Sequence, residues 1–302
     1  MKLAYGRGVK EAIDARRGVV ALESTVIAHG LPRPRNLETA RLLEGDVRDA
    51  GAVPATICLA DGLVVVGASD ALLARLANED GVAKVSTRDL APFLARLPAD
   101  GLGATTVATT AEIAARAGVE VFATGGIGGV HRGAERTMDV SADLLALAAH
   151  PVVVVCAGAK LVLDLAKTLE QLETLGVPVI GYRTDELPAF YVRSSGLPVP
   201  HRVDDAVAAA RIARLQLERG AGMLVCVPIP EAHALPRAEM EREIEAALAA
   251  AEAAGVHGSG VTPFLLAHLG QASSGRTLDA NVALLRNNAR VAAAIATALA
   301  GM

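Results

Sequence analysis

The chain has 302 residues, of which 52% are hydrophobic, and carries a formal net charge of −4. This size and composition permit a sizeable core, so we expect residues 1–302 to form a single domain. The low aromatic content, 2%, and the lack of a basic block argue against a nucleic-acid partner and favour a small-molecule ligand.

Three cysteines, Cys58, Cys156 and Cys226, lie in apolar runs without C-x-x-C spacing. This pattern predicts buried, reduced thiols rather than a zinc site or disulfides. The N-terminus lacks the apolar core of a signal peptide, and no apolar stretch approaches about 18 residues. We therefore expect a cytoplasmic protein without a membrane span.

Short apolar runs alternate with helix-like segments, which is typical of parallel strands joined by helical crossovers. An Asp61-Gly62 pair between two runs indicates a hairpin, so part of the sheet should be antiparallel. The expected fold is three-layer α/β/α with a mostly parallel, mixed central sheet and a peripheral C-terminal helical layer. The predicted strands span residues 19–22, 55–59, 63–66, 119–123, 152–156, 177–182 and 222–227. The predicted helices span residues 36–50, 70–78, 111–117, 143–149, 161–175, 204–218, 237–254 and 278–299.

Two charged residues in the first third of the chain are candidates for chemistry. Glu23 directly follows the first predicted strand and precedes small hydroxyl residues and a Gly/Pro turn. A carboxyl group there can have a raised pKa and act as a general acid, although a solvated loop carboxylate has the same pattern. Lys84 could bind an anionic substrate, although a surface lysine is the simpler explanation.

Two segments of small residues follow. The threonines of GATTVATT, residues 103–110, precede a predicted helix and could bind an anion or a carbonyl group at its N-terminus, or simply cap it. The segment ATGGIGGVHRG, residues 123–133, fails as a dinucleotide fingerprint because His131 replaces the third glycine. The four glycines at 125, 126, 128 and 129 predict left-handed turns or close approach to a ligand, and His131 and Arg132 suit a polar substrate.

Polar residues also mark two later segments. Asp139 and Asp143 are four apart and could share a helix face, or each could be an ordinary charge near a helix N-terminus. Two carboxylates without His or Cys suit a water-rich magnesium or manganese ion better than zinc. Asn281, Asn287 and Asn288 are poor helix formers in an otherwise apolar helix, which indicates a role beyond helix propensity.

The run PVVVVCAGAK, residues 151–160, has the pattern of a strand buried on both faces. Small residues then leave room beside the chain, so Lys160 would emerge where a strand passes to a helix, a usual site of chemistry in α/β sheets. A partly desolvated amine there can act as a nucleophile. From this stretch alone, a solvated surface lysine is the commoner explanation.

Together these segments resemble the pseudouridine-5'-phosphate glycosidase family from about residue 21 to residue 289. The matching blocks, in chain order, are ALESTVIAHGLPRP, KVSTRDL, GATTVATT, FATGGIGGVHRG, MDVSADL, VVCAGAKLVLD, HGSGVTPFLL and LDANVALLRNNA. The resemblance implies an α/β/α homotrimer that reversibly cleaves pseudouridine 5'-phosphate to uracil and ribose 5-phosphate. It also implies a divalent ion, usually manganese.

By motif position, the resemblance implies that Lys160 is the covalent nucleophile, that Glu23 is the proton donor and that Asp139 binds the metal. The implied substrate-binding positions are Lys84, Val107, Ser141, Ala142 and Asp143. Further candidate substrate contacts, chiefly to uracil, are Thr106, Thr124, His131 and Asn281.

Two other functions fit the residues. An aldolase-like Schiff-base lyase acting on a sugar phosphate would keep Lys160 but would need no uracil pocket, so uracil binding separates it from the glycosidase. A non-catalytic nucleotide-binding module would use only the glycine-rich loop and would give no role to Lys160 or Glu23.

Overall fold

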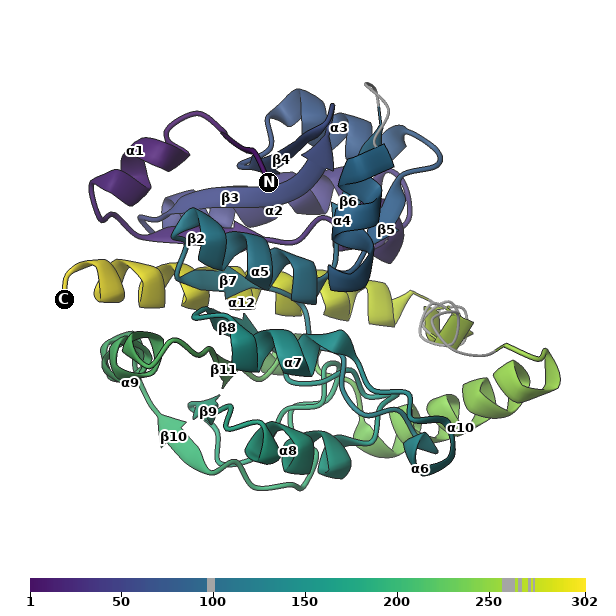
Figure 1. The fold of residues 1–302 in the computed structure, drawn as a ribbon. Helices are drawn as coiled ribbons and strands as arrows, with labels where there is room; N and C mark the ends of the chain where they lie inside the picture. The colour runs from purple at the N-terminus through teal and green to yellow at the C-terminus, as the bar shows by residue number, and fades with distance from the viewer. Residues whose placement is uncertain (97–100, 257–263, 266–267, 271–272, 274) are drawn as a thin grey trace.

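A computed structural model describes residues 1–96, 101–256, 264–265, 268–270, 273 and 275–302. Within these residues, helices cover both faces of a central sheet (Figure 1), which confirms the predicted three-layer α/β/α class. The strands are β1 (Leu3–Tyr5), β2 (Val19–Leu22), β3 (Val53–Ala60), β4 (Leu63–Val66), β5 (Ala83–Val85), β6 (Leu102–Thr105), β7 (Val121–Ala123), β8 (Val153–Cys156), β9 (Val179–Tyr182), β10 (His201–Val203) and β11 (Met223–Cys226).

The helices cover most of the predicted segments. They are α1 (Val9–Asp14), η1 (Val26–Gly30), α2 (Arg35–Asp49), α3 (Asp70–Asn78), α4 (Thr87–Arg96), α5 (Val107–Ala117), α6 (Ala134–Thr137), α7 (Ala142–Ala149), α8 (Leu165–Thr174), α9 (Ala206–Glu218), η2 (Glu231–His233), α10 (Arg237–Ala253) and α12 (Arg276–Ala300). Most of the HGSGVTPFLL block lies outside the described residues. Among the described residues, none of the helices combines the length and apolar character that a membrane span needs.

The sheet has the order β1-β4-β3-β2-β7-β8-β11-β9-β10, with β6 pairing with β3 and β5 pairing with β6. β3 pairs antiparallel with β4 and with β6, and the other strand pairs are parallel. The β3–β4 pairing confirms the predicted hairpin. Sequence patterns missed β1, β5, β6 and β10 because their sequences, LAY, AKV, LGAT and HRV, lack the apolar β-branched runs that mark the central strands.

Two helix starts differ from prediction. α5 begins at Val107, four residues early, because the Thr106 hydroxyl caps it by accepting from the Thr109 N–H at 3.5 Å. α8 begins at Leu165 rather than 161 because the carboxylate of Asp164 caps it, accepting from the Lys167 N–H at 3.1 Å. The residues before Asp164 instead form turns, which leaves Lys160 outside the helix.

The centre of the sheet is the core. All four residues of β8 have no exposed surface, as expected for a parallel strand covered on both faces. Cys58, Cys156 and Cys226 are free and buried, which confirms their predicted role as core residues. Burial raises the pKa of the Cys58 thiol to about 12, so this group remains protonated at neutral pH.

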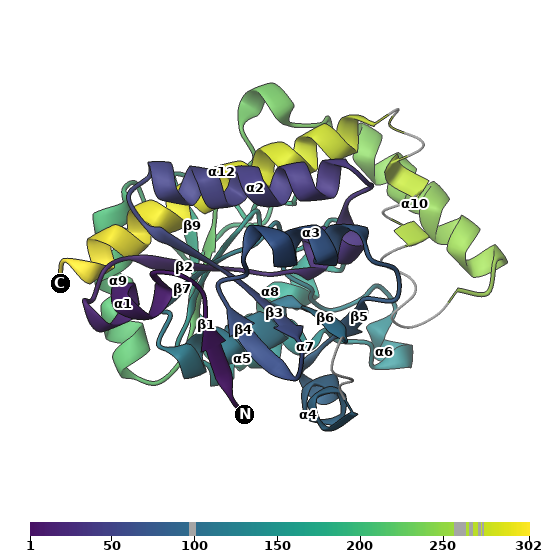
Figure 2. The same ribbon diagram turned by 90° about the horizontal axis from the view of Figure 1, so that it is seen from above.

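The predicted peripheral position of the last helix is wrong. α12 lies against β2, β7 and β8, beside α2 and α9, so it forms a central part of one helical layer (Figures 1 and 2). The Asp46 side chain of α2 is only 6% exposed and accepts from Arg286 at 2.6 and 3.0 Å and from Arg290 at 2.9 and 2.6 Å. Desolvation acts to raise the pKa of Asp46, but the two guanidinium groups outweigh it and lower that pKa. This charged clamp joins α12 to α2.

Candidate active site

The register of three parallel strands brings the candidate catalytic residues to one edge of the sheet. Leu22 of β2 pairs with Ala123 of β7, and Ala123 pairs with Val155 of β8. The residues that follow these strands therefore emerge side by side at their carboxyl ends. They include Glu23 after β2 and Thr124 after β7.

Glu23 is partly buried, and both of its carboxylate oxygens are hydrogen-bonded. Oε1 accepts from the Thr124 hydroxyl and Oε2 accepts from the Thr25 hydroxyl. Desolvation raises the pKa of Glu23, although both hydroxyls and the positive charge of Lys160 oppose this rise. The predicted raised pKa is thus confirmed. Since a hydroxyl can also accept, this arrangement can satisfy the protonated carboxyl as well.

Lys160 lies between β8 and α8 on a segment bonded to the glycine-rich loop. Its N–H donates to the Ile127 carbonyl at 3.1 Å, and the Ile127 N–H donates to the Gly158 carbonyl at 3.1 Å. Gly158 has φ of 81°, and a Cβ there would clash with the Pro188 carbonyl oxygen. Only glycine fits this position without strain, so Gly158 helps to fix the backbone that carries Lys160.

Most glycines of the glycine-rich loop serve packing, and the left-handed turn that the sequence offered as one alternative occurs only at Gly133, with φ of 77°. The glycines at 125, 126, 128 and 129 do not lie in the left-handed region. A Cβ on Gly126 would lie 2.6 Å from the Phe190 ring, and Cβ atoms on Gly128 and Gly129 would clash with the side chains of Ser141 and Thr168. Glycine is therefore required at these positions because other side chains of the protein pack closely against the loop.

Asp143 links the glycine-rich loop to α5. Its buried carboxylate accepts from the Ala108 N–H at 3.0 Å and from the Gly128 N–H at 2.8 Å. The suggestion that Asp139 and Asp143 share a helix face is wrong, because α7 begins only at Ala142. Both oxygens of Asp143 are used by backbone amides, so this residue organises the site rather than offering a free carboxylate.

The N-terminus of α5 lies close to Lys84, because the Thr106 N–H donates to the carbonyl of the adjacent Val85 at 3.2 Å. Asp143 links α5 to the start of α7. The Ser141 hydroxyl caps α7 by accepting from the Asp143 N–H at 3.2 Å. Among the described residues, the amides of Val107 and Ala142 donate to no acceptor. Desolvation lowers the pKa of Lys84, as does the positive charge of Lys160, while Glu23 and Asp143 oppose this effect. Helix N-termini and a lysine together suit an anion.

Asp139 lies on the loop before α7, with His131 beside it. Its Oδ2 is 3.8 Å from the His131 Nδ1, and its carbonyl accepts from the His131 N–H at 3.0 Å. Within the described ranges, no three His, Cys, Asp or Glu side chains form a group that could hold a metal. A partly exposed carboxylate can still anchor a hard divalent ion that keeps most of its water ligands.

The asparagines of α12 lie close to this edge. The Asn288 Nδ2 donates to the Thr124 carbonyl at 2.8 Å, whereas the Asn287 Nδ2 donates to the Pro228 carbonyl at 3.3 Å. Asn281 is two helical turns before Asn288 on the same face, about 10 Å along the axis. Because Asn288 lies level with the end of β7, Asn281 lies beyond that end, on the side of the candidate site.

Two contacts at this site were not assigned from the sequence: the Thr25 hydroxyl, which donates to Glu23, and the Asn288 amide, which donates to the Thr124 carbonyl. Thr25 stood only among small hydroxyl residues after the first strand, and nothing in the local pattern marked it as a hydrogen-bond donor to Glu23. Asn288 had one usable signal, its poor helix propensity in an apolar helix, but the Thr124 carbonyl that it contacts is 164 positions away in the chain.

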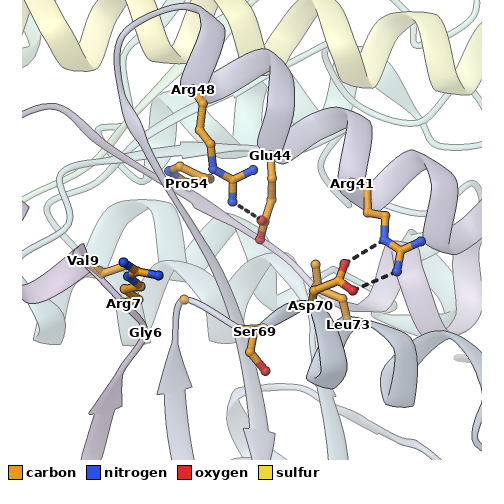
Figure 3. Close-up of a pocket in the computed structure, with 12 residues that line it drawn as sticks. Gly6, Arg7, Val9, Arg41, Glu44, Arg48, Pro54, Ser69, Asp70 and Leu73 are labelled. Atoms are coloured by element: carbon orange, nitrogen blue, oxygen red, sulfur yellow. Dashed lines mark hydrogen bonds and ion pairs between the residues drawn. The ribbon is translucent and has the colours of Figure 1, made fainter.

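Two surface cavities lie elsewhere. One of about 440 Å³ is lined by Arg41, Glu44, Arg48 and Asp70, whose side chains form two ion pairs (Figure 3). The other, of about 490 Å³, lies near the amino-terminal ends of β2 and β7. Neither is lined by Glu23 or Lys160, so the candidate site is defined by converging side chains rather than by these cavities.

Comparison with known proteins gave closely similar relatives. The family model described as indigoidine synthase A like protein matches residues 8–298. The chain is 55% identical over 300 residues to the pseudouridine-5'-phosphate glycosidase of Chloroflexus aurantiacus, covering 97% of each chain. It is 53% identical over 299 residues to the protein of the same name from Sorangium cellulosum, covering 98% of this chain and 93% of that one.

Two solved structures are also similar. The prealnumycin C-glycosynthase AlnA, in complex with ribulose 5-phosphate, has a TM-score of 0.91 and 46% identity, covering 100% of this chain and 98% of that chain. An indigoidine synthase A-like protein from Thermotoga maritima has a TM-score of 0.88 and 36% identity, covering 99% of this chain and 97% of that chain.

The raised pKa of Glu23 predicts a pH-dependent gain in stability on substitution. The folded state binds this proton more tightly than the unfolded state, so the contribution of Glu23 is full below its ordinary pKa and is lost as pH rises through the folded pKa. Glu23→Gln should therefore be more stable than wild type at pH 8, with the difference vanishing near pH 4. Chemical denaturation across this range measures it. Glu38→Gln, at an exposed position on α2, is the control for the loss of one carboxylate, and a pH-independent difference for Glu23→Gln would contradict the prediction.

Proposed function

The chain belongs to the indigoidine synthase A like family, and we infer from its close relatives and its site that it is a pseudouridine-5'-phosphate glycosidase. It reversibly cleaves the C–C glycosidic bond of pseudouridine 5'-phosphate to give uracil and ribose 5-phosphate. The observation that carries this assignment is the convergence of Glu23, with its raised pKa, and Lys160 at one strand edge. Identity of more than 50% to named glycosidases over nearly the whole chain favours it over an aldolase-like lyase or a binding module.

The bond that breaks explains the need for a lysine. It joins C1' of the ribose to a carbon of uracil, which is a poor leaving group for hydrolysis by two carboxylates. An amine that bonds to C1' divides this difficult step into easier ones. We therefore propose that Lys160 acts through a covalent adduct.

In the proposed sequence, Glu23 protonates the ring oxygen as the C1'–O4' bond breaks, and the neutral Lys160 amine bonds to C1' and then loses a proton, which restores its lone pair. Uracil C5 then gains a proton, and the nitrogen lone pair forms a C1'=N double bond as the C1'–C5 bond breaks and uracil leaves. Water hydrolyses the resulting Schiff base to ribose 5-phosphate and regenerates the amine. Glu23 suits the first step because desolvation raises its pKa and keeps more of it protonated.

The phosphate is assigned to the anion site at α5 and α7. The amides of Val107 and Ala142 and the hydroxyl of Ser141 offer donors, and Lys84 offers a positive charge. Asp143 holds the two helix N-termini around this position.

Uracil is assigned to the side of Glu23 that faces away from the proposed phosphate site. Thr124 contacts the Glu23 carboxylate, and Asn281 lies on the α12 face that passes the end of β7. Thr106 and His131 are the further candidates for polar contacts with the base or sugar.

We also propose a divalent ion, Mn²⁺, anchored by Asp139 chiefly through water. The partly exposed carboxylate and the lack of soft ligands among the described residues near it fit such an ion. When bound, the ion would neutralise negative charge near the phosphate.

The assembly and location follow the family resemblance. We propose a single-domain subunit, a homotrimer and a cytoplasmic location. The three free, buried thiols are compatible with a reducing compartment.

The nucleophile can be trapped. Wild-type protein incubated with ribose 5-phosphate and borohydride should carry a reduced sugar adduct on Lys160, detectable by mass spectrometry. Lys160→Ala should lose nearly all turnover yet remain folded, whereas Lys167→Ala, an exposed lysine on α8, should stay active. Glu23→Ala should lower the rate by about 10²–10⁴-fold. An adduct on Lys84 instead would mean that Lys84 is the nucleophile and that Lys160 binds the phosphate.

The phosphate assignment predicts a substrate-dependent effect at Lys84. Charge-assisted hydrogen bonds contribute about 1.5–3 kcal/mol each, so Lys84→Ala should lower kcat/KM for pseudouridine 5'-phosphate by about 10–150-fold. The same change should have little effect on the much slower turnover of pseudouridine. Equal turnover of nucleoside and nucleotide by the wild type would count against the assignment.

The metal proposal predicts loss of activity in excess chelator, with Mn²⁺ restoring it better than Zn²⁺. Asp139→Asn should need a higher Mn²⁺ concentration for half-maximal activity because one anionic ligand is lost. Assays at graded free Mn²⁺ measure this, and full activity in excess chelator would refute the proposal.

A further inference from the structure

We propose that Asn288 is a positioning residue, which holds the chain at Thr124 so that the Thr124 hydroxyl stays directed at Glu23. The inference rests on the proposed function in one respect, the role of Glu23 as proton donor. It deepens that function by assigning a task to a buried polar residue on the last helix.

The first step of the argument is local geometry. The Asn288 Nδ2 donates to the Thr124 carbonyl at 2.8 Å and lies 3.4 Å from the Gly125 carbonyl. Because both neighbours are acceptors, the amide orientation is determined by its partners. Among the described residues, the Thr124 carbonyl accepts from no other donor, so Asn288 alone satisfies it.

The second step is the link to Glu23. The Thr124 hydroxyl that contacts Glu23 Oε1 belongs to the residue whose carbonyl Asn288 holds. The Thr124 N–H donates to the Val155 carbonyl at 3.0 Å on the neighbouring strand. The backbone of Thr124 is thus held on both sides, by β8 and by α12, which leaves its side chain little freedom to turn away.

The third step concerns the choice of residue. Asn288 is 1% exposed, and its Oδ1 has no hydrogen-bond partner among the described residues. An unpaired buried acceptor and a poor helix former both disfavour folding. An apolar residue would avoid both, so the asparagine is explained by what its amide does at Thr124 rather than by stability of the helix.

The fourth step is the anchoring of the helix itself. Arg286 and Arg290 lie two residues on either side of Asn288, about 200° away around the helix, and both bind Asp46 of α2. The clamp therefore lies on one side of this turn and the sheet on the other. This arrangement restrains α12 from rotating or sliding, so Asn288 stays level with Thr124.

The test measures the Glu23 carboxyl directly. NMR titration of protein labelled at the glutamate carboxyl carbon, assigned with Glu23→Gln, gives the Glu23 pKa without turnover. Loss of a donor to the carboxylate raises its pKa, so Asn288→Ala should raise the pKa of Glu23 and lower kcat by about 10–100-fold. Asn288→Leu fills the same volume without donors and has the same expected outcome if the alanine variant does not fold.

Two comparisons distinguish a positioning role of Asn288 from a general loss of structure in the variant. Asn287→Ala is the matched control, since its amide contacts Pro228 rather than the glycine-rich loop, and it should leave the Glu23 pKa and kcat unchanged. In a Thr124→Val background, Asn288→Ala should cause no further rise in the Glu23 pKa. An unshifted pKa in both Asn288 variants, or an equal shift in the Thr124→Val background, would overturn the inference. Failure of the wild type to release uracil would instead reject the proposed function.

Discussion

The parallel register of β2, β7 and β8 is the constraint on which the site depends. It places the ends of three buried strands level with one another, so Glu23 and Thr124 emerge together although 101 positions separate them. The glycine-rich loop then runs beside the segment that carries Lys160, joined through Ile127 and Gly158. A shift of one residue would turn each side chain to the other face, so the register is enforced by the core on both sides of the sheet.

Burial and charge act against each other at this edge. Desolvation dominates at Glu23 and raises its pKa, although Lys160 and two hydroxyls favour the ionised form. Desolvation also dominates at Lys84, where the charge of Lys160 adds to it. The charges of Glu23 and Lys84 therefore each act on the environment of the other. Loss of charge at Lys160 would raise the pKa of Glu23 further and keep the acid protonated.

The sequence predicted the layers, the central strands and the pairing in the hairpin, because apolar runs of β-branched residues, such as the run that forms β8, have a clear pattern. It also located Glu23 and Lys160, since residues at the ends of parallel strands must share an edge. It could not show that both carboxylate oxygens of Asp143 accept from backbone amides. Nor could it show that glycines 126, 128 and 129 leave room for the side chains of Phe190, Ser141 and Thr168. Those facts depend on contacts between distant segments, as does the central position of α12.

The glycine-rich loop connects the two halves of the site. Its Gly128 N–H binds the same carboxylate as the Ala108 N–H of α5, on the side assigned to the phosphate. One residue earlier, Ile127 accepts from the backbone of Lys160, on the side assigned to the nucleophile. Adjacent residues of one tightly packed loop therefore set the spacing between anion site and amine. In the proposed function, a ribose 5-phosphate would span that spacing when its ring opens, with its phosphate at the anion site and its C1' at the amine.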